Sequence, residues 1–402
     1  MLAVAEAQAR ILAALGPVGA ETVSLAQCAG RTLAVDLVAK LTQPPAAVSA
    51  MDGYAVRAAD ITNAPASLRQ IGTAPAGHPF PGRIGQGECV RIFTGAIVPE
   101  GADTILIQEN AEADGDRIRA KQSEPVGRFV RPAGLDFKRG QNLLPAGTVL
   151  GPRQIGLAAA TNHAWLEVRR RPRVAILATG DEIVLPGTEP QPGQIVSSNS
   201  AALAAFVEQA DGIASVLPIA PDTTEALQAL AAGARGADLL VTTGGASVGD
   251  HDLVRAALGQ SGLALDFWQI AMRPGKPLMF GRYGDVPMLG LPGNPVSSLV
   301  CAVLFLGPIL ATMLGRANPL PKRRRAILGC DLAANDMRED YLRAKIAADE
   351  NGNLVATPFA RQDSSMLALL ATADGLVVRP PHAPAAKQGD SVQFVELAPV
   401  CG

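Results

Sequence analysis

The sequence has 402 residues, 48% of them hydrophobic, which excludes a disordered chain and supplies apolar cores for roughly two to three domains. Its 35 basic and 37 acidic side chains nearly cancel, so binding to nucleic acid by bulk charge is excluded, while a local anion site stays open. The cysteines and histidines are scattered without a CxxC pair, a pattern that favours neither a disulfide framework nor a zinc site.

The first 170 residues divide by composition into two intermixed parts. Residues 43–140 carry short apolar runs between Gly, Pro and Asp turns, and Asp114-Gly115 indicates a hairpin, so we predict a β-rich lobe. Residues 1–42 and 141–170 are more helical in composition, and we predict that they pack together as a segmented helical stalk. Because charged residues interrupt the first apolar stretch, an export signal is not expected, and we expect a cytoplasmic protein.

Residues 171–321 alternate between strand-like and helix-like segments. This alternation predicts a mostly parallel sheet with helices on both faces, a three-layer α/β/α domain. The predicted strands are 173–178, 214–219, 238–242, 263–270, 278–280 and 287–291, and the predicted helices are 198–209, 223–232, 250–258 and 295–313.

The last of these helices also tests for a membrane span. Residues 294–315 carry no charge, and Lys322 to Arg325 follow them, so length and composition alone allow a transmembrane helix. Pro295 opens the segment, Pro308 interrupts it, and a strand with a Gly turn precedes it. We therefore interpret it as a buried helix of the α/β layer and expect no membrane association.

Residues 322–402 are again β-rich. Asn351-Gly352 between two apolar runs predicts a second hairpin, and 391–397 resembles a closing strand. We predict a small C-terminal β-barrel.

Polar loops follow four predicted strands of the α/β domain. They are Thr179–Glu182, the segment at Asp222, Thr243–Asp252 and Pro292–Ser298. Any one of them is explained equally well by a tight connection or a helix cap. Since ligands bind beyond the carboxyl ends of parallel strands, four such loops at one sheet edge favour a binding site.

The residue types in these loops indicate an anionic ligand. Gly244–Gly249 offers free backbone N–H groups at a helix N-terminus. Gly293 with Ser297 and Ser298 forms a second such anion-binding turn on the neighbouring loop. Two such cradles suit a phosphorylated or nucleotide-like ligand, although neither the Walker motif nor GxGxxG is present. The abundant nearby carboxylates suit Mg²⁺ between phosphate oxygens; they are Asp181, Glu182, Asp222, Asp250 and Asp252.

A short turn adds positive charge beside these loops. In Met272–Pro277, Arg273 and Lys276 stand in a Pro-restrained turn, and we expect them to position an oxyanion or a phosphate. The alternative is a surface turn with two solvated side chains.

Motifs along nearly the whole chain resemble those of the MoeA family of molybdopterin molybdenumtransferases, which includes the C-terminal part of gephyrin. The matching stretches are SAMDGYAV from Ser49, RIFTGAIVPEGADTILIQEN from Arg91, ATGDEIV from Ala178, QIVSSNS from Gln194, TTGGASVGDHD from Thr242, RPGKP from Arg273 and LPGNPVSS from Leu291. Individually the motifs in the lobe are weak, and it is their ordered set that is specific.

The resemblance implies a four-part protomer with the boundaries given above, and an elongated homodimer. The active cleft then lies between the α/β domain of one subunit and the lobe of the other. The implied reaction inserts molybdate, as substrate, into adenylylated molybdopterin and releases AMP with Mg²⁺ present. Transient contact with the molybdopterin adenylyltransferase and with apo-molybdoenzymes is implied as well.

Carried over by motif position, the implied catalytic residues are Asp52, Thr94, Glu182 and Asp252, with Glu182 and Asp252 also as metal ligands. The implied substrate-binding residues are Gly244, Gly245, Ser247, Gly249, Asp222, Arg131, Asp136, Arg273, Lys276, Gly293, Asn294, Ser297, Ser298 and Ser364. The chain departs from many members at Gln269 and Arg273, where they carry Lys; Arg273 keeps the charge and Gln269 does not.

Three alternatives stay open at this point. The adenylyltransferase that activates molybdopterin shares the α/β module but is a single small domain, so the extra N- and C-terminal regions argue against it. A tungsten-specific paralogue has the same motifs. A non-catalytic scaffold, a role that gephyrin also has, is disfavoured by the retention of Asp52, Glu182 and Asp252 together.

Overall fold

The α/β domain is built on a six-stranded sheet whose central strands are completely buried. The computed structural model describes residues 1–244, 253–260 and 262–397. The strand order is β16-β13-β17-β21-β20-β18, with β16, β13, β17 and β21 parallel and β20 antiparallel to both of its neighbours. The strands are β13 (Arg173–Ala178), β16 (Ile213–Val216), β17 (Leu239–Thr243), β18 (Leu263–Trp268), β20 (Met279–Tyr283) and β21 (Val286–Leu291).

Helices cover both faces of this sheet, which confirms the predicted three-layer arrangement. One face packs against α3, α6 and α7 through residues such as Leu203, Val300 and Leu310, and the other packs against α4 and α5 through Leu227 and Val254. The helices are α3 (Asn199–Gln209), α4 (Thr224–Ala231), α5 (Leu253–Gln260), α6 (Pro295–Cys301) and α7 (Gly307–Met313), with a π-helical segment η5 (Ala302–Leu306) between the last two. A short parallel ribbon, β14 (Ile183–Val184) with β15 (Ile195–Val196), follows β13.

The run from Pro295 to Met313 is long and apolar enough to cross a membrane by length and composition alone, but 78% of it is buried inside the fold. Its side chains belong to the main core beside the sheet. The apolar composition is therefore accounted for by packing within the protein, as Pro295 at the start of the segment and Pro308 within it indicated.

Helix α1 (Val4–Ala13) lies with the α/β domain, which differs from the expectation for residues 1–42. Val4, Ala7 and Ile11 are buried in the same cluster as the sheet, and the Gln8 amide donates to the carbonyl oxygen of Leu304 at 2.9 Å. The amphipathic spacing of α1 predicts a helix, but it does not specify which apolar face the helix covers.

The stalk proper is formed by two chain segments that are far apart in the sequence. Strand β1 (Ala20–Ser24) pairs with β12 (Trp165–Arg169), and β2 (Leu37–Val38) pairs with β11 (Asn142–Leu144). The helix α2 (Pro152–Ala160) packs on a small core that includes Cys28, Leu33, Leu150 and Val168. Within the described residues the stalk is thus mainly short strand pairs with α2, less helical than its composition suggests.

The lobe is a curled sheet with an apolar cluster on each face. Its strand order is β7-β4-β6-β5-β9-β8, and the Asp114-Gly115 turn joins β8 to β9 as predicted. The strands are β4 (Gly53–Val56), β5 (Ala66–Ala74), β6 (Glu88–Ile92), β7 (Thr104–Ile107), β8 (Ala111–Asp114) and β9 (Arg117–Ala120), with β3 (Val48–Ser49) paired to β10 (Val130–Arg131) at the base.

The C-terminal region closes into the predicted barrel because β23 pairs with both β24 and β25. The strands are β22 (Arg323–Leu328), β23 (Glu339–Ala348), β24 (Leu354–Pro358), β25 (Gly375–Arg379) and β26 (Ser391–Glu396), and α8 (Leu367–Ala371) lies beside them. The predicted Asn351-Gly352 turn joins β23 to β24. The two-residue strand β19 (Met272–Arg273) leaves the α/β domain and pairs with β23.

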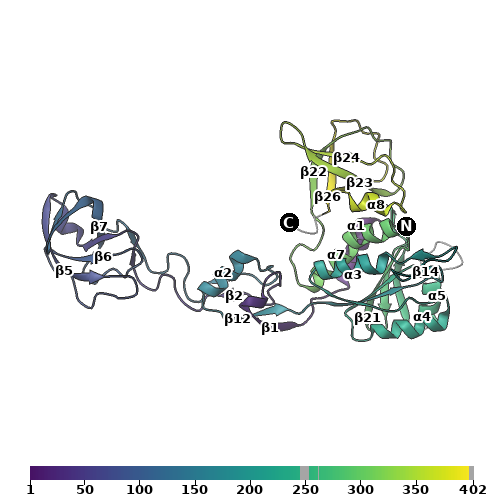
Figure 1. The fold of residues 1–402 in the computed structure, drawn as a ribbon, viewed down its shortest axis with the longest axis horizontal. Coiled ribbons are helices and arrows are strands. Elements are labelled where there is room, and N and C mark those ends of the chain that lie inside the picture. Colours follow the sequence, from purple (N-terminus) through teal and green to yellow (C-terminus); the bar gives the residue numbers. More distant parts are fainter. Residues whose placement is uncertain (245–252, 261, 398–402) are drawn as a thin grey trace.

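Figure 1 shows how these parts are arranged. The lobe lies at one end of an elongated molecule, the stalk lies in the middle, and the α/β domain and the barrel lie together at the other end. Residues of the lobe and residues of the sheet edge are therefore far apart within one chain.

Candidate functional site

The carboxyl edge of the parallel sheet brings together the loops that the sequence singles out. Ala178 is paired with Thr243, and Thr243 with Leu291, so the three loops that follow β13, β17 and β21 begin side by side. The Asn199 amide, at the start of α3, donates to the Thr243 hydroxyl at 2.8 Å and to the Gly293 carbonyl at 2.7 Å. One side chain thus ties together the loops that follow β17 and β21.

Gly244 allows the backbone to come unusually close to its neighbour. Its φ is +93°, and a Cβ atom there would lie 2.4 Å from the carbonyl oxygen of Thr179. Gly293 also lies close to Gly244: a Cβ atom added to Gly293 would lie 3.4 Å from the Gly244 Cα. The predicted cradle residues Gly245, Ser247 and Gly249, and the carboxylates Asp250 and Asp252, lie outside the described residues.

Several buried polar atoms at this edge have no hydrogen-bond partner among the described residues. They include the Thr179 hydroxyl, the Asn199 amide oxygen and the Ser298 hydroxyl. Since buried polar groups are normally satisfied, these atoms offer unused bonding capacity next to the glycine turn. Ser297 and Ser298 are both buried at the start of α6.

A group of carboxylates flanks the cradle. The Asp222 backbone N–H donates to the Asp181 carboxylate at 3.0 Å, and the Glu182 carboxylate folds back over Gly180. Partial burial raises the pKa of Asp222, and the negative charges of Asp181 and Glu182 raise it further. A cation at this position relieves that repulsion.

The described residues hold no group of three or more His, Cys, Asp or Glu side chains arranged around one metal position. Mg²⁺ commonly needs only one or two carboxylates because phosphate oxygens and water complete its shell. The donors present, Glu182 and Asp222, fit that requirement when a phosphorylated ligand is bound.

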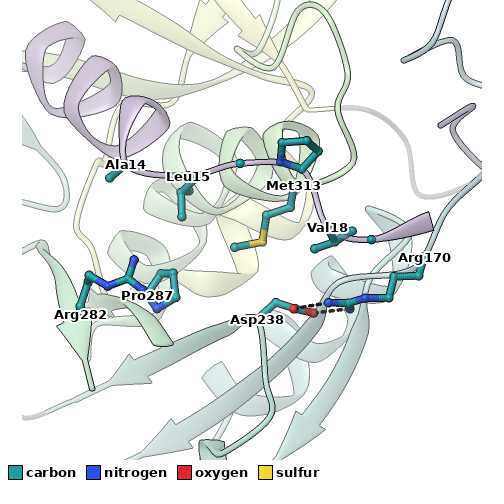
Figure 2. Close-up of a pocket in the computed structure, with 11 residues that line it drawn as sticks. Ala14, Leu15, Val18, Arg170, Asp238, Arg282, Pro287 and Met313 are labelled. Carbon is teal, nitrogen blue, oxygen red and sulfur yellow. Dashed lines mark hydrogen bonds and ion pairs between the residues drawn. The ribbon is translucent and has the colours of Figure 1, made fainter. Parts of the chain in front are cut away.

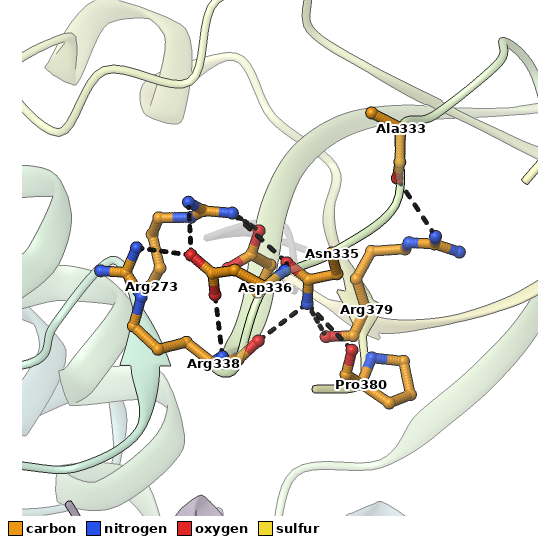
Figure 3. Close-up of polar contacts among 8 residues, drawn as sticks. Arg273, Ala333, Asn335, Asp336, Arg338, Arg379 and Pro380 are labelled. Carbon is orange, nitrogen blue, oxygen red and sulfur yellow. Dashed lines mark hydrogen bonds and ion pairs between the residues drawn. The ribbon is translucent and has the colours of Figure 1, made fainter. Parts of the chain in front are cut away.

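The turn that carries Arg273 and Lys276 lies at the same sheet edge, since it joins β18 to the antiparallel β20. Its two cations are engaged differently. Arg273 forms ion pairs with Asp340 and with Asp336 of the barrel region, the latter at 3.3 Å (Figure 3). Lys276 is half-buried and makes no ion pair within the described parts of the chain. The structure therefore separates two residues that the sequence suggests act together.

A loop of the barrel reaches the sheet edge through Ser364. The Asn294 amide donates to the Ser364 hydroxyl at 2.8 Å, and the Val296 N–H donates to the Ser364 carbonyl at 3.3 Å. Sequence analysis gave no role to Arg343, which is only 1% exposed and donates to the carbonyl oxygens of Asp363 and Met366 on either side of Ser364. A lone Arg within a strand pattern gave no signal for this role.

In the lobe, Asp52 and Thr94 form a compact pair. One Asp52 carboxylate oxygen accepts hydrogen bonds from the Thr94 N–H and from the Thr94 hydroxyl, both at 2.7 Å. These two bonds hold the pKa of Asp52 below its ordinary value. Both side chains are accessible to solvent, so the carboxylate is charged and available to a ligand.

Arg91 is a second residue beside this pair that the sequence analysis did not assign. Its guanidinium lies 5.1 Å from the ring centroids of both Tyr54 and Phe93, and it donates to the Gln108 side chain at 2.7 Å. It therefore places a fixed positive charge near Asp52. The sequence feature that could have pointed to Arg91 is its position as the first residue of the RIFTG stretch.

Arg131 and Asp136 lie at the base of the lobe. Arg131 is exposed on β10, whose partner β3 leads into the Asp52 turn. The Asp136 backbone N–H donates to the Gln43 carbonyl where the lobe meets the stalk. The lobe lies at the end of the molecule away from the α/β domain of the same chain (Figure 1).

A separate pocket of 360 Å³ lies at the opposite edge of the sheet, where the stalk joins the α/β domain (Figure 2). Leu15, Met313 and Pro287 line it, and Arg170 forms two hydrogen bonds with Asp238 at 2.5 and 2.6 Å. Since Asp238 precedes β17, this pocket is at the amino ends of the strands and is distinct from the candidate site.

Three family models together match most of the chain. The MoeA N-terminal region (domain I and II) matches residues 2–161, the "Probable molybdopterin binding domain" matches 175–312, and the MoeA C-terminal region (domain IV) matches 325–397.

Relatives with the same organisation agree. The chain is 36% identical to the molybdopterin molybdenumtransferase 2 of Mycobacterium tuberculosis, covering 94% of this chain and 95% of the relative. It is 39% identical to a molybdopterin molybdenumtransferase of Nostoc sp. over 74% of this chain and 70% of that protein. The solved structure of the molybdopterin biosynthesis MoeA protein from Pyrococcus horikosii superposes with a TM-score of 0.86 at 30% identity, covering 99% of this chain and 100% of that one.

Proposed function

This chain belongs to the MoeA family of molybdopterin molybdenumtransferases, which act in molybdenum cofactor biosynthesis, and we propose that it inserts molybdate into adenylylated molybdopterin with release of AMP. The observation that carries the proposal is the sheet edge, where Gly244 and Gly293 come together beside buried polar atoms that have no hydrogen-bond partner in the described part of the chain. Backbone N–H groups and helix N-termini at such an edge suit a phosphate-bearing ligand.

In this proposal Glu182 and Asp222 would hold Mg²⁺ when the phosphorylated ligand is bound, and Asp252 is assigned to the same ion by its motif position alone. The ion would supply positive charge beside the phosphate that leaves with AMP. The raised pKa of Asp222 supports the assignment, because closely placed carboxylates are stabilised in their charged form by a cation.

Lys276 supplies positive charge for molybdate or for the neighbouring phosphate. Molybdate is a doubly charged anion whose hydration must be replaced by fixed donors and cations. Lys276 lies at the carboxyl edge of the sheet, the proposed ligand edge, and has no ion-pair partner within the described residues. Ser364 and Asn294, joined by a hydrogen bond, form the wall of the site on the barrel side.

Asp52, Thr94 and Arg91 complete the site from a second copy of the chain in a homodimer. The distance between lobe and sheet edge within one chain supports this arrangement (Figure 1). Subunit exchange tests it: mixing inactive Asp52→Ala with inactive Glu182→Ala protein should restore up to about a quarter of wild-type activity, because each mixed dimer keeps one intact site. Failure to restore activity in demonstrated mixed dimers contradicts shared sites.

The function itself is tested by supplying purified protein with adenylylated molybdopterin, molybdate and Mg²⁺, and measuring activation of an apo-molybdoenzyme. We expect activation that requires all three components, in keeping with contacts to the adenylyltransferase upstream and to apo-molybdoenzymes downstream in the cytoplasm. Activation by tungstate in preference to molybdate indicates a tungsten-specific paralogue. Binding without turnover indicates a gephyrin-like scaffold.

A further inference from the structure

We propose that Arg273 is a positioning residue, which fastens the C-terminal barrel to the α/β domain and so holds Ser364 at the ligand edge. The inference rests on the proposed function for its effect on ligand binding, whereas the fastening itself does not depend on that function. It assigns Arg273 a different role from the anion ligand expected from the sequence.

Backbone hydrogen bonds join the α/β domain to the barrel. Strand β19 leaves the α/β domain and pairs in parallel with β23 of the barrel, with Arg273 opposite Asp340. The Glu339 N–H donates to the Ala271 carbonyl at 2.9 Å and extends this junction. Two residues of strand are a short contact, so side chains must supply much of what fixes the orientation of the barrel.

The Arg273 guanidinium supplies the polar part of that contact (Figure 3), beside an apolar cluster in which Tyr341 and Val378 of the barrel pack with the α/β core. It donates to the Asp340 carboxylate, to Asp336 at 3.3 Å and to the Asn335 side-chain oxygen at 3.3 Å. Asp340 is only 4% exposed, and a buried carboxylate requires a charged partner. Hydrogen bonds from Arg338 and the charge of Arg273 hold the pKa of Asp336 down at about 2, so the Asp336 carboxylate is charged at neutral pH.

The charge of Arg273 is therefore already matched by two carboxylates. An oxyanion ligand must displace at least one of them or accept their repulsion. The forked donors that make Arg suitable for an anion are here directed at the barrel.

The same strand continues to the ligand edge. Arg343 lies three residues beyond Asp340 on β23, and its buried guanidinium holds the carbonyl groups that flank Ser364. Ser364 then contacts Asn294 and Val296 at the start of α6. Loss of the Arg273 contact loosens the barrel and, through β23, the position of Ser364.

Hydrogen exchange tests the fastening without any ligand. In Arg273→Gln and Asp340→Asn, we expect faster exchange of peptides that cover 362–366 and Val296, whose N–H bonds to Ser364. The matched control is Arg324→Gln, which removes an exposed ion pair to Glu396 elsewhere on the same barrel and should leave these peptides unchanged. Unchanged exchange in both test variants overturns the proposal.

Measured binding of adenylylated molybdopterin distinguishes a positioning role of Arg273 from direct contact between Arg273 and the ligand. We expect both variants to bind adenylylated molybdopterin roughly tenfold more weakly, the double variant no worse than either single one, and kcat at saturation to stay within about twofold of wild type. Arg273→Lys, which keeps one ion pair, should recover part of the loss. Weaker binding in Arg273→Gln but not in Asp340→Asn means direct contact and overturns the proposal. If the wild type binds no adenylylated molybdopterin while exchange responds as expected, the proposed function fails and the fastening stands.

Discussion

Substitution of Gly244 by alanine tests the cradle at the sheet edge. The backbone there has φ +93°, and an added Cβ would lie 2.4 Å from the Thr179 carbonyl oxygen. A conformation of this kind costs a non-glycine residue about 1–3 kcal/mol. Relief of the collision must also move the Gly244 turn or the loop after β13, and both belong to the ligand edge. We expect ligand binding to weaken more than tenfold while the protein remains folded at assay temperature.

Gly236 provides the matched control. It lies before β17, at the opposite edge of the sheet, with φ +82° and no atom within 4 Å of an added Cβ. Gly236→Ala therefore carries comparable backbone strain without the collision, and we expect a decrease in melting temperature of roughly 2–10 °C with unchanged turnover. Thermal unfolding and equilibrium binding of adenylylated molybdopterin separate the two effects. Wild-type binding by Gly244→Ala would refute the assignment of this turn to the ligand.

Four other variants address the Asp52–Thr94 pair, Asp222, and the Arg170–Asp238 ion pair outside the candidate site. Thr94→Ala should reduce turnover with little change in melting temperature, since Thr94 is exposed and orients Asp52, and Thr94→Ser should restore it; equal loss in both variants contradicts a role for the hydroxyl. Protons should compete with Mg²⁺ for the Asp222 carboxylate. The Mg²⁺ concentration for half-maximal activity should therefore rise as the pH falls towards the raised pKa of Asp222. Asp222→Asn should abolish this pH dependence. Burial opposes ionisation of Asp238, but the hydrogen bonds from Arg170 outweigh it and lower the pKa of Asp238 below its ordinary value of 3.8. The Arg170–Asp238 pair therefore stabilises the fold fully at pH values above 3.8. The difference in melting temperature between wild type and Arg170→Gln should vanish as the pH falls through the lowered pKa of Asp238.

Local patterns were sufficient for the parts of the fold that depend on nearby residues. Alternating strands and helices predicted the α/β layers, Asp-Gly and Asn-Gly predicted both hairpins, and the parallel topology placed Gly244, Gly293 and the Glu182 loop at one edge. These predictions succeed because hydrophobic period and turn chemistry are encoded within about ten residues.

Contacts between distant segments were not predictable in the same way. The partner of Arg273 is Asp340, 67 residues away in another domain, and nothing in the Arg-Pro-Gly-Lys turn distinguishes an ion pair of this kind from an anion site. Helix α1 likewise covers a core that is completed by residues near 300. Such choices depend on how whole domains pack, which local propensity does not determine.

We propose that molybdate insertion and AMP release are one coupled reaction at the sheet edge. The most direct measurement is a single-turnover experiment with protein in excess over adenylylated molybdopterin, in which released AMP and protein-bound cofactor molybdenum are quantified together. We predict equal amounts of the two products, no AMP without molybdate or Mg²⁺, and loss of both products in Glu182→Gln. Molybdate-independent AMP release, or molybdenum insertion without AMP, would contradict it.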